Sequence, residues 1–459
     1  MDVLIVGAGP TGLTLACDLA RQGVDFRIVA REPRPAPGSR GFSLKPLSLA
    51  ALDDLGAAPA ITAAGSVERR TRFHLGTRLL FRGDVPPDVA TAENPYPNLI
   101  ALPQWRTEAI LRERLAELGR AVEFGVEVTG VDGERVTLAT GEAITARFVV
   151  GADGGHSVVR KAMGVAFTGH SGEQSAVVAD VRLDGLDPAD GVHLWLDPGA
   201  GMLAARPQGA GLWQIVASGV EADPDVLRAA FRTRSGRPDL RITEVEWISR
   251  WRYNVRMASR FRAGNRFVAG DAAHVHSPFG GHGMNTGIQD AYNLGWKLGM
   301  VLRGEATGAL LDTYEIERMP VARSILADSD RRMSGMLGSR LARPLLGPLM
   351  KAGMARQSRR NRRDHPAYPE GPLITAGGGH PAPDGRLPTG ARLFDLFRGS
   401  HFTVLGPAPV PGLDLGFVRQ VQVTGPFRVV RPDGYLALVA PGPQPVLDYF
   451  ARVRAPALV

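Results

Sequence analysis

The sequence predicts a mixed α/β fold, in which a parallel nucleotide-binding sheet carries an inserted, mainly antiparallel sheet and is followed by a short α/β segment. Apolar runs at residues 3–6, 147–150 and 266–270 each end at a loop with Gly or Asp, as buried parallel strands do at their carboxyl ends. Residues 173–257 instead contain runs such as VHLWLD and LWQIVAS, which are typical of an antiparallel sheet. The 459 residues suffice for two or three domains.

The composition is that of an ordinary globular protein, with 44% apolar and 22% charged residues. The net charge of +8 permits anionic partners, but its excess lies largely in residues 331–363, where we expect a solvated, partly helical surface and no nucleic-acid site. Cys17 is the single cysteine, so a cysteine metal site and an intrachain disulfide are excluded, and a cytoplasmic location fits. We expect neither a signal peptide nor a membrane segment.

The first strand leads through a glycine-rich turn into a helix. Residues 3–6 are followed by GAGPTG at residues 7–12, after which apolar residues recur at helical spacing. In a strand–turn–helix of this kind, Gly7 allows the tight turn, Gly9 allows a pyrophosphate to approach the backbone, and Gly12 allows the helix to pack on the strand. The sequence therefore predicts a dinucleotide site here.

The second strand of this unit, at residues 26–29, lacks the usual acid at its end. A carboxylate is expected there to bind a ribose hydroxyl, but the sequence has Ala30, Arg31 and Glu32. The acid is either absent or displaced by two residues to Glu32.

Residues 39–150 alternate between loops, helices and short strands. A loop at Ser39 and Arg40 opens into a helix around residues 46–55, and residues 60–100 are expected to form inserted strands and loops. A further helix follows Gln104, and a hairpin turn is expected at residues 132–133. The apolar run at 147–150 then ends in Gly151-Ala-Asp153-Gly154, which repeats the pattern of a core strand that delivers an Asp to a loop.

The antiparallel region contains one helix, near residues 225–234, and we expect its sheet to form one wall of a ligand pocket. This sheet contains four large side chains, Trp195, Met202, Arg206 and Trp213. Each of them fits a core or surface position better than a ligand contact. An inward-pointing Arg206 would suit an anionic ligand.

The chain then returns to the first sheet at residues 266–270, and Asp271 at the strand end can accept a hydrogen bond from a ligand hydroxyl. Pro278 and several glycines forbid regular structure until a helix begins near Thr286, which has capping-box spacing to Gln289. One apolar stripe runs along this helix. Its first turn would present unpaired N–H groups and partial positive charge to a ligand in the loop.

Three motifs in this order resemble the class A flavoprotein monooxygenases, the para-hydroxybenzoate hydroxylase-like aromatic hydroxylases of the phenol and polyketide type. They are GAGPTG at 7–12, GADG at 151–154 with Ser157 and Arg160, and GD at 270–271 with the loop from Pro278 to Asn285. The resemblance covers residues 1–365 and implies a Rossmann-like FAD-binding domain. The tail resembles a shortened thioredoxin-like C-terminal domain, but without Cys-x-x-Cys it cannot perform disulfide chemistry.

The resemblance implies a division of the chain into five segments. Residues 1–172 begin the FAD-binding domain, with inserted strands at about 60–100, and residues 259–365 complete it. Residues 173–258 between them form the substrate-binding sheet, residues 366–390 a linker, and residues 391–459 the thioredoxin-like domain. The resemblance also implies that FAD is bound by Gly7, Gly9, Pro10, Thr11, Gly12, Arg40, Gln104, Val128, Asp153, Asp271, Pro278, Gly281, Gly283, Met284 and Asn285, to which we add Arg31 and Glu32 after the second strand.

Within this set, Val128 corresponds to an adenine-side backbone contact and Asp271 to the acid that binds the ribityl chain. Residues 281–285 would bring N–H groups to the flavin N1–C2=O edge. Asp153 and Arg160 match a motif linked with FAD and with the reduced nicotinamide.

The implied activity is hydroxylation of a phenolic or polyketide substrate, which could be anionic, by FAD, NADPH or NADH, and O₂ through a flavin C4a-hydroperoxide. No second glycine motif marks a nicotinamide domain, which agrees with transient NAD(P)H binding in this family. Two alternatives stay open: Baeyer–Villiger or antibiotic-inactivating oxygenation on the same fold, and a catalytically silent flavin-binding relative. We expect a monomer or homodimer.

His274, His276 and His282 lie close together in one loop and could indicate a metal. With no cysteine nearby and the loop already assigned to the flavin, we predict no metal site. His282 stands where relatives commonly have Gln, so it is a candidate for lining the pocket and steering a phenolate, or else a solvent-exposed loop histidine.

If Ala30 leaves the ribose without its acid, FAD should dissociate readily on purification. The loss of one charge-assisted hydrogen bond corresponds to about ten- to a hundredfold in affinity, so Ala30→Glu should tighten FAD binding by a similar factor. The FAD dissociation constants of the variant and the wild type, compared in one titration, test this. Equal constants would refute the missing-acid interpretation.

Overall fold

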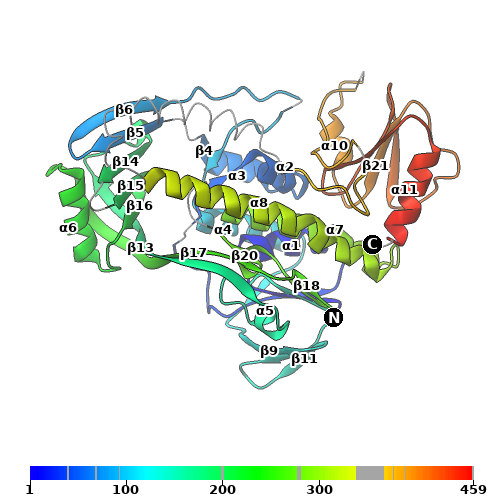
Figure 1. The fold of residues 1–459 in the computed structure, drawn as a ribbon, viewed down its shortest axis with the longest axis horizontal. Coiled ribbons are helices and arrows are strands. Elements are labelled where there is room, and N and C mark those ends of the chain that lie inside the picture. Colours follow the sequence, from blue (N-terminus) through cyan, green and yellow to red (C-terminus); the bar gives the residue numbers. More distant parts are fainter. Residues whose placement is uncertain are drawn as a thin grey trace.

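The computed structural model describes residues 1–456 apart from 39–40, 68–69, 93, 198–200, 277–280, 338–365, 376 and 388. Figure 1 shows the large antiparallel sheet at the left and the C-terminal sheet at the right, with the long helices crossing the middle of the molecule. Among the described helices, none combines the length and apolar character needed to cross a membrane. Arg40 and Pro278, two of the predicted FAD contacts, lie outside the described residues.

The first sheet has six strands in the order β18-β19-β12-β1-β2-β8. Their bounds are β1 Val3–Val6, β2 Phe26–Ala30, β8 Val122–Phe124, β12 Phe148–Gly151, β18 Arg262–Ala263 and β19 Arg266–Val268. All neighbours pair in parallel except β18 and β19. Apolar side chains on both faces bury this sheet, which explains why its strands read as continuous apolar runs.

Two helices pack unusually closely beside this sheet. A Cβ atom added at Gly287, Gly295 or Gly299 of α7 (Gly283–Leu302) would overlap the side chain of Thr11, Asp18 or Gln22 respectively. These three partners belong to α1 (Pro10–Arg21) and its C-terminal cap. The glycines therefore allow α7 to approach the helix that follows the glycine-rich turn.

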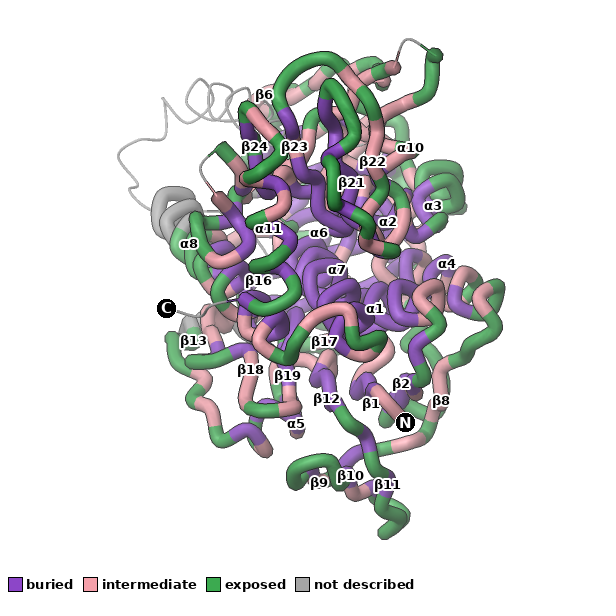
Figure 2. The backbone as a smooth tube through the Cα atoms, turned by 90° about the vertical axis from the view of Figure 1, so that its right-hand side faces the viewer, coloured by how far each residue is buried: buried purple, intermediate pink, exposed green. Residues whose placement is uncertain are grey.

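The predicted start of α7 was wrong. The helix begins at Gly283 rather than near Thr286, whose hydroxyl donates to the carbonyl of His282 at 2.9 Å, and Gln289 donates to the carbonyl of Leu47 at 3.1 Å instead of forming a capping box. Asn285 donates to the carbonyl of Gly281 at 2.8 Å, which extends the helical turn backwards. Residues 285–301 are all buried, so the polar side chains of this helix are enclosed together with its apolar stripe (Figure 2).

The second sheet has eight strands in the order β20-β17-β13-β16-β15-β14-β5-β6. Their bounds are β5 Arg70–Leu75, β6 Arg78–Asp84, β13 Phe167–Asp184, β14 Val192–Asp197, β15 Gly201–Gly209, β16 Leu212–Ser218, β17 Arg241–Ala258 and β20 His274–Val275. Only β14 and β5 pair in parallel. Helix α6 (Pro224–Ser235) covers one face, and the region 60–100 contributes β5 and the edge strand β6.

Short elements complete this region of the chain. The strands are β3 Ser43–Leu44, β4 Ser66–Val67, β7 Ile100–Ala101, β9 Val128–Asp132, β10 Arg135–Leu138 and β11 Ala143–Thr145. The helices are α2 Pro46–Asp54, α3 Ala58–Ala64, α4 Gln104–Glu117, α5 Val158–Ala162 and α8 Asp312–Leu337, with single 3₁₀ turns at Pro188–Asp190, Gly270–Ala272 and Gly308–Leu311.

The C-terminal sheet has the order β22-β21-β23-β24, from β21 Phe402–Gly406, β22 Val418–Gln422, β23 Phe427–Val430 and β24 Leu436–Ala440. Helices α10 (Leu393–Phe397) and α11 (Gln444–Arg454) accompany it. The thioredoxin-like assignment of this segment stays a prediction.

Buried ion pairs join the C-terminal segment to the long helices. Arg431 donates to both carboxylate oxygens of Glu317 in α8, at 2.6 and 2.8 Å, and also pairs with Asp433. Lys297 of α7 donates to the same Glu317 at 2.7 Å. Burial alone raises the pKa of Glu317, but Arg431 and Lys297 outweigh burial and lower that pKa from 4.5 to about 2.

Glu317→Gln should therefore destabilise the protein by about 3–5 kcal/mol at neutral pH, because it leaves Lys297 buried without its counter-charge and removes one of the carboxylates that bind Arg431. The control Glu113→Gln removes a carboxylate that is 61% exposed and 3.4 Å from Arg106, and should cost about 0–1 kcal/mol. Urea unfolding measures both.

The folded-state pKa of Glu317 is depressed, so its contribution to stability is present above pH 4.5 and is lost as the pH falls towards about 2. The loss of stability in this acid window should be smaller in Glu317→Gln than in the wild type. Equal destabilisation by the two variants, or an unchanged acid profile, would contradict this account of the network.

Candidate active site

Three strand ends lie side by side at one edge of the six-stranded sheet. Strands β19, β12 and β1 are consecutive and parallel, so the residues that follow them share this edge. The N–H of Ala152 donates to the carbonyl of Val6 at 2.8 Å, and the N–H of Ala269 donates to that of Gly151 at 3.0 Å. The loops that carry Gly9, Asp153 and Asp271 therefore leave the sheet next to one another.

The three glycines of the first turn have different surroundings. Gly7 has a φ of +107°, and a Cβ atom there would overlap the carbonyl of Ala152. A Cβ atom on Gly12 would overlap the carbonyl of Gly7, whereas a Cβ atom on Gly9 would meet nothing within 4 Å. The first and third glycines are thus required by packing, and Gly9 alone faces open space at the start of α1. This is the shape that a pyrophosphate needs to approach the backbone.

Pro10 and Thr11 complete this turn. Pro10 is the first residue of α1, where its missing N–H costs nothing. A Cβ atom added to Gly270 or Gly287 would overlap Thr11, so the Thr11 side chain fills the space between the loop after β19 and the first turns of α7. Thr11 therefore fixes the position of α7 relative to the glycine-rich turn.

Asp153, Ser157 and Arg160 hold the loop after β12. Asp153 accepts a hydrogen bond from the N–H of Val158 at 2.7 Å, and Ser157 accepts one from the N–H of Arg160 at 3.0 Å, so both cap α5. Arg160 donates to the carbonyls of Gly155 at 2.7 Å and Ala272 at 2.9 Å. Burial raises the pKa of Asp153 above its usual value. These contacts tie the β12 loop to the loop that carries Asp271.

We call the space beside the loops that carry Gly9, Asp153 and Asp271 the candidate cradle. Asp271 lies in the 3₁₀ turn after β19 and is exposed. Its Oδ1 atom would lie 3.8 Å from a Cβ atom added to Gly283, so it faces the first residue of α7. A carboxylate there can accept a hydrogen bond from a ligand hydroxyl.

Asp290 of α7 fixes this turn from the inside. It accepts hydrogen bonds from the N–H of Gly270 at 3.0 Å, from Nε2 of His274 at 2.6 Å and from Nε of Arg318 at 2.7 Å. Burial alone raises the pKa of Asp290, but His274 and Arg318 outweigh burial and lower it to about 2. The carboxylate is therefore ionised and is a structural anchor for the Gly270–Asp271 turn.

The start of α7 is joined to the segment before α2. The side-chain oxygen of Asn285 accepts from the N–H of Lys45 at 2.7 Å, and its amide nitrogen donates to the carbonyl of Ser43 at 2.9 Å. The ammonium of Lys45 lies 2.9 Å from Nδ1 of His282. Sequence analysis selected His282 and Asn285 but missed Lys45, although a lysine directly before a helix is an unusual choice that could have drawn attention to it.

The other predicted FAD contacts differ in their burial and in their hydrogen-bond partners. Gln104 accepts from the N–H of Gly41 at 3.0 Å and so holds the segment that follows Arg40. Val128 is buried in β9. Arg31 and Glu32 are exposed and pair with each other at 3.1 Å, beside the end of β2. Glu32 thus lies near the place where the usual acid would stand, with Arg31 as its partner.

Each histidine of the loop has at least one side-chain contact. His274 and His276 contact each other at 2.9 Å, and His274 also contacts Asp290. Burial, followed by His274 and His282, lowers the pKa of His276 well below 6.5. In the described regions of the chain, no group of three or more His, Cys, Asp or Glu side chains is arranged to hold a metal ion.

The eight-stranded sheet has one face against α6 and one towards the first domain. Trp195 and Trp213 are 2% and 1% exposed and belong to the core beneath α6, together with Phe231. Arg206 points to the other side, where its guanidinium lies 5.6 Å from the ring centre of Phe42. Arg206 therefore lies on the face opposite α6, and its contact with a ligand stays a prediction. Met202 is half-buried.

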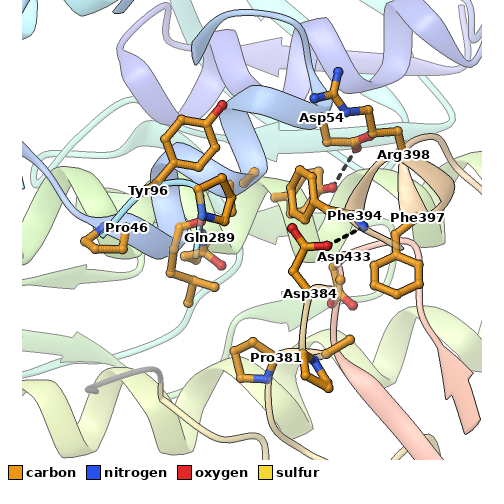
Figure 3. Close-up of a pocket in the computed structure, with 18 of the residues that line it drawn as sticks. Pro46, Asp54, Tyr96, Gln289, Pro381, Asp384, Phe394, Phe397, Arg398 and Asp433 are labelled. Carbon is orange, nitrogen blue, oxygen red and sulfur yellow. Dashed lines mark hydrogen bonds between the residues drawn. The ribbon is translucent and has the colours of Figure 1, made fainter. Parts of the chain in front are cut away.

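A cavity of about 340 Å³ lies elsewhere, where α2 and α7 meet the C-terminal segment (Figure 3). Its walls include Pro46, Tyr96, Phe394 and Arg398. None of the predicted FAD contacts lines it, so it is separate from the cradle at the strand ends.

Comparison with known proteins agrees with this geometry. Residues 1–329 match the FAD binding domain family. A flavin-dependent monooxygenase of Mycobacteroides abscessus is 39% identical over 490 residues, covering 99% of this chain and 100% of that protein. The 6-methylpretetramide 4-monooxygenase of Streptomyces rimosus is 41% identical over 343 residues, covering 72% of this chain and 61% of that protein.

Among solved structures, the flavin-dependent monooxygenase PieE, in complex with FAD and substrate, superposes with a TM-score of 0.86 at 25% identity over 98% of both chains. The match to the FAD binding domain covers well over half of the chain, and the first relative matches along its full length. The chain therefore belongs to the FAD-binding family of flavin-dependent monooxygenases.

Proposed function

We propose that this protein is an FAD-dependent monooxygenase that uses NAD(P)H and O₂ to hydroxylate a phenolic or polycyclic aromatic substrate. One observation carries the proposal: the ends of β1, β12 and β19 and the first turn of α7 meet at one edge of the sheet. The relatives named above support the chemistry, since one of them is named for oxygenation of the polycyclic 6-methylpretetramide.

The residues at this edge fit FAD. The open space at Gly9 and the start of α1 suit the pyrophosphate, and Asp271 suits a ribityl hydroxyl. The N–H groups at residues 283–285 suit the pyrimidine edge of the flavin, where negative charge gathers on reduction. When bound, FAD supplies the redox chemistry: it takes hydride from the nicotinamide and activates O₂.

The chain itself must hold the aromatic ring and keep water away from the flavin. We propose that the face of the eight-stranded sheet opposite α6 does this, because Arg206 lies on that face over Phe42. A guanidinium there favours an anionic or ionisable phenolic substrate.

We further propose the division into an FAD-binding domain of residues 1–172 and 259–365, an inserted substrate sheet at 173–258 and a thioredoxin-like segment at 391–459. The continuity of β19 with β12, on either side of the inserted sheet, supports the first two of these units. The mixed four-stranded sheet with α11 supports the last. Tyr368 and Ile374 of the proposed linker at 366–390 are buried against Val321 and Tyr435.

Gly9→Leu should separate FAD binding from folding. A side chain at Gly9 meets nothing within 4 Å, so the melting temperature of the FAD-free protein should stay close to that of the wild type. The same side chain would occupy the pyrophosphate site and weaken FAD binding by at least about tenfold. The contrasting variant Gly12→Ala should destabilise the FAD-free protein, because its Cβ atom overlaps the carbonyl of Gly7. Unchanged FAD affinity in Gly9→Leu would place the pyrophosphate elsewhere.

The activity is tested with the FAD-loaded protein, NADPH or NADH, and a panel of phenols and polycyclic phenols. We expect aromatic substrate to stimulate oxidation of the nicotinamide, and one oxygen atom from ¹⁸O₂ to appear in the product. If FAD binds but no compound of the panel stimulates oxidation of the nicotinamide, the result would favour the catalytically silent flavin-binding alternative. The missing acid at Ala30 points to the same alternative. An oxygen atom inserted into a ring C–C bond would favour the Baeyer–Villiger alternative.

A further inference from the structure

The cavity beside Tyr96 has walls from both ends of the chain. Its described walls come from α2, α7, residues 94–96 and several C-terminal residues between 381 and 434. Its volume of about 340 Å³ is in the range of small-molecule sites. None of the described FAD contacts expected from the sequence lies on these walls. A molecule bound in this cavity would therefore not compete with FAD for its contacts.

The walls of this cavity are mainly apolar rings that the fold already holds in position. Tyr96 and Phe394 contribute aromatic rings. Much of the remaining wall consists of proline rings, from Pro46, Pro95, Pro381, Pro383 and Pro432. Asp384 accepts a hydrogen bond from the N–H of Phe394 at 2.8 Å, which fixes that segment (Figure 3). Such preformed walls suit a flat aromatic ligand, because binding does not require them to become ordered.

Each charged side chain that the structure describes along these walls is paired with one of opposite charge. The pairs are Asp54 with Arg21 at 2.6 Å, Asp384 with Arg392 at 3.0 Å, Asp433 with Arg431 at 2.6 Å and Arg398 with Asp53 at 2.7 Å. A charged ligand would lose its hydration here without gaining a counter-charge of its own. The cavity therefore favours an uncharged molecule.

Gln289 of α7 offers one hydrogen-bond acceptor on the walls. Its side chain is 6% exposed, and its Nε2 atom donates to the carbonyl of Leu47 at 3.1 Å. This bond assigns the other end of the amide as the oxygen. Among the described residues, no group donates a hydrogen bond to Oε1 of Gln289. A largely buried carbonyl oxygen is stabilised when it gains a donor, so the cavity favours a ligand with a hydroxyl or N–H group.

We propose that this cavity is a second binding site, for a small, uncharged aromatic molecule that contacts Tyr96 and Phe394 and donates a hydrogen bond to Oε1 of Gln289. A neutral phenol has this chemistry, so the ligand class overlaps with the substrates of the proposed function. The site itself does not rest on that function, because it shares no described residue with the predicted FAD contacts.

The test uses the full-length, FAD-loaded protein and three naphthalenes of similar size at pH 7. 2-Naphthol is neutral and has a donor, 2-methoxynaphthalene lacks the donor, and naphthalene-2-sulfonate is an anion. Calorimetric titration should show 2-naphthol binding in the cavity. 2-Methoxynaphthalene should bind there about three- to tenfold more weakly, as expected for one lost hydrogen bond, and the sulfonate should not bind there.

Three variants assign this binding to the cavity. Ala50→Trp fills the cavity from α2 and should remove one bound 2-naphthol per chain without changing FAD affinity. The control Ala116→Trp places the same side chain at an exposed position of α4 and should bind 2-naphthol as the wild type does. Gln289→Leu removes the acceptor, so it should bind 2-naphthol and 2-methoxynaphthalene about equally. A general distortion of the walls would weaken both compounds instead.

Equal amounts of bound 2-naphthol in the wild type and in a folded Ala50→Trp would overturn the inference. So would a preference for 2-naphthol that persists in Gln289→Leu, and this comparison decides the matter if Ala50→Trp does not fold. Binding of the sulfonate that Ala50→Trp abolishes would overturn the choice of an uncharged ligand. A protein that binds 2-naphthol in the cavity but oxidises no nicotinamide with any phenol refutes the proposed function and leaves this inference standing.

Discussion

The burial of residues 285–301 of α7 is the constraint on which the rest of the structure depends. A helix buried on every face must find partners inside the protein for each polar side chain that it carries. Asp290 meets Gly270, His274 and Arg318, while Lys297 meets Glu317, which in turn binds Arg431 from the C-terminal segment. These partners come from three separate regions of the chain, so burial of one helix fixes the relative positions of all three.

This constraint also shapes the candidate cradle. The same Asp290 that satisfies His274 holds the turn that presents Asp271, and Thr11 fills the space that glycines leave between α1 and α7. The start of α7 thereby stands beside both the glycine-rich turn and Asp271. Arg431 of the C-terminal segment pairs with Glu317 of α8, which also pairs with Lys297 of α7, so this segment contributes to the rigidity of the site without supplying any of the predicted FAD contacts.

Much of the arrangement could be predicted from the sequence because it follows from strand order. Parallel strands deliver the residues after their carboxyl ends to one edge, so the glycines after β1, Asp153 after β12 and Asp271 after β19 could be expected together. The contacts between distant side chains could not, because neither residue of a pair such as Lys45 and His282 carries a pattern that names the other. The start of α7 was misplaced for a similar reason: its first turn depends on Asn285 binding across to Ser43.

The most direct test of the central claim is an experimental structure of this protein with FAD bound. The account predicts the pyrophosphate against Gly9 and the start of α1, a ribityl hydroxyl on Asp271, and the pyrimidine edge of the flavin at residues 283–285. An FAD molecule bound away from these three places, for instance in the cavity beside Tyr96 and Phe394, would contradict it.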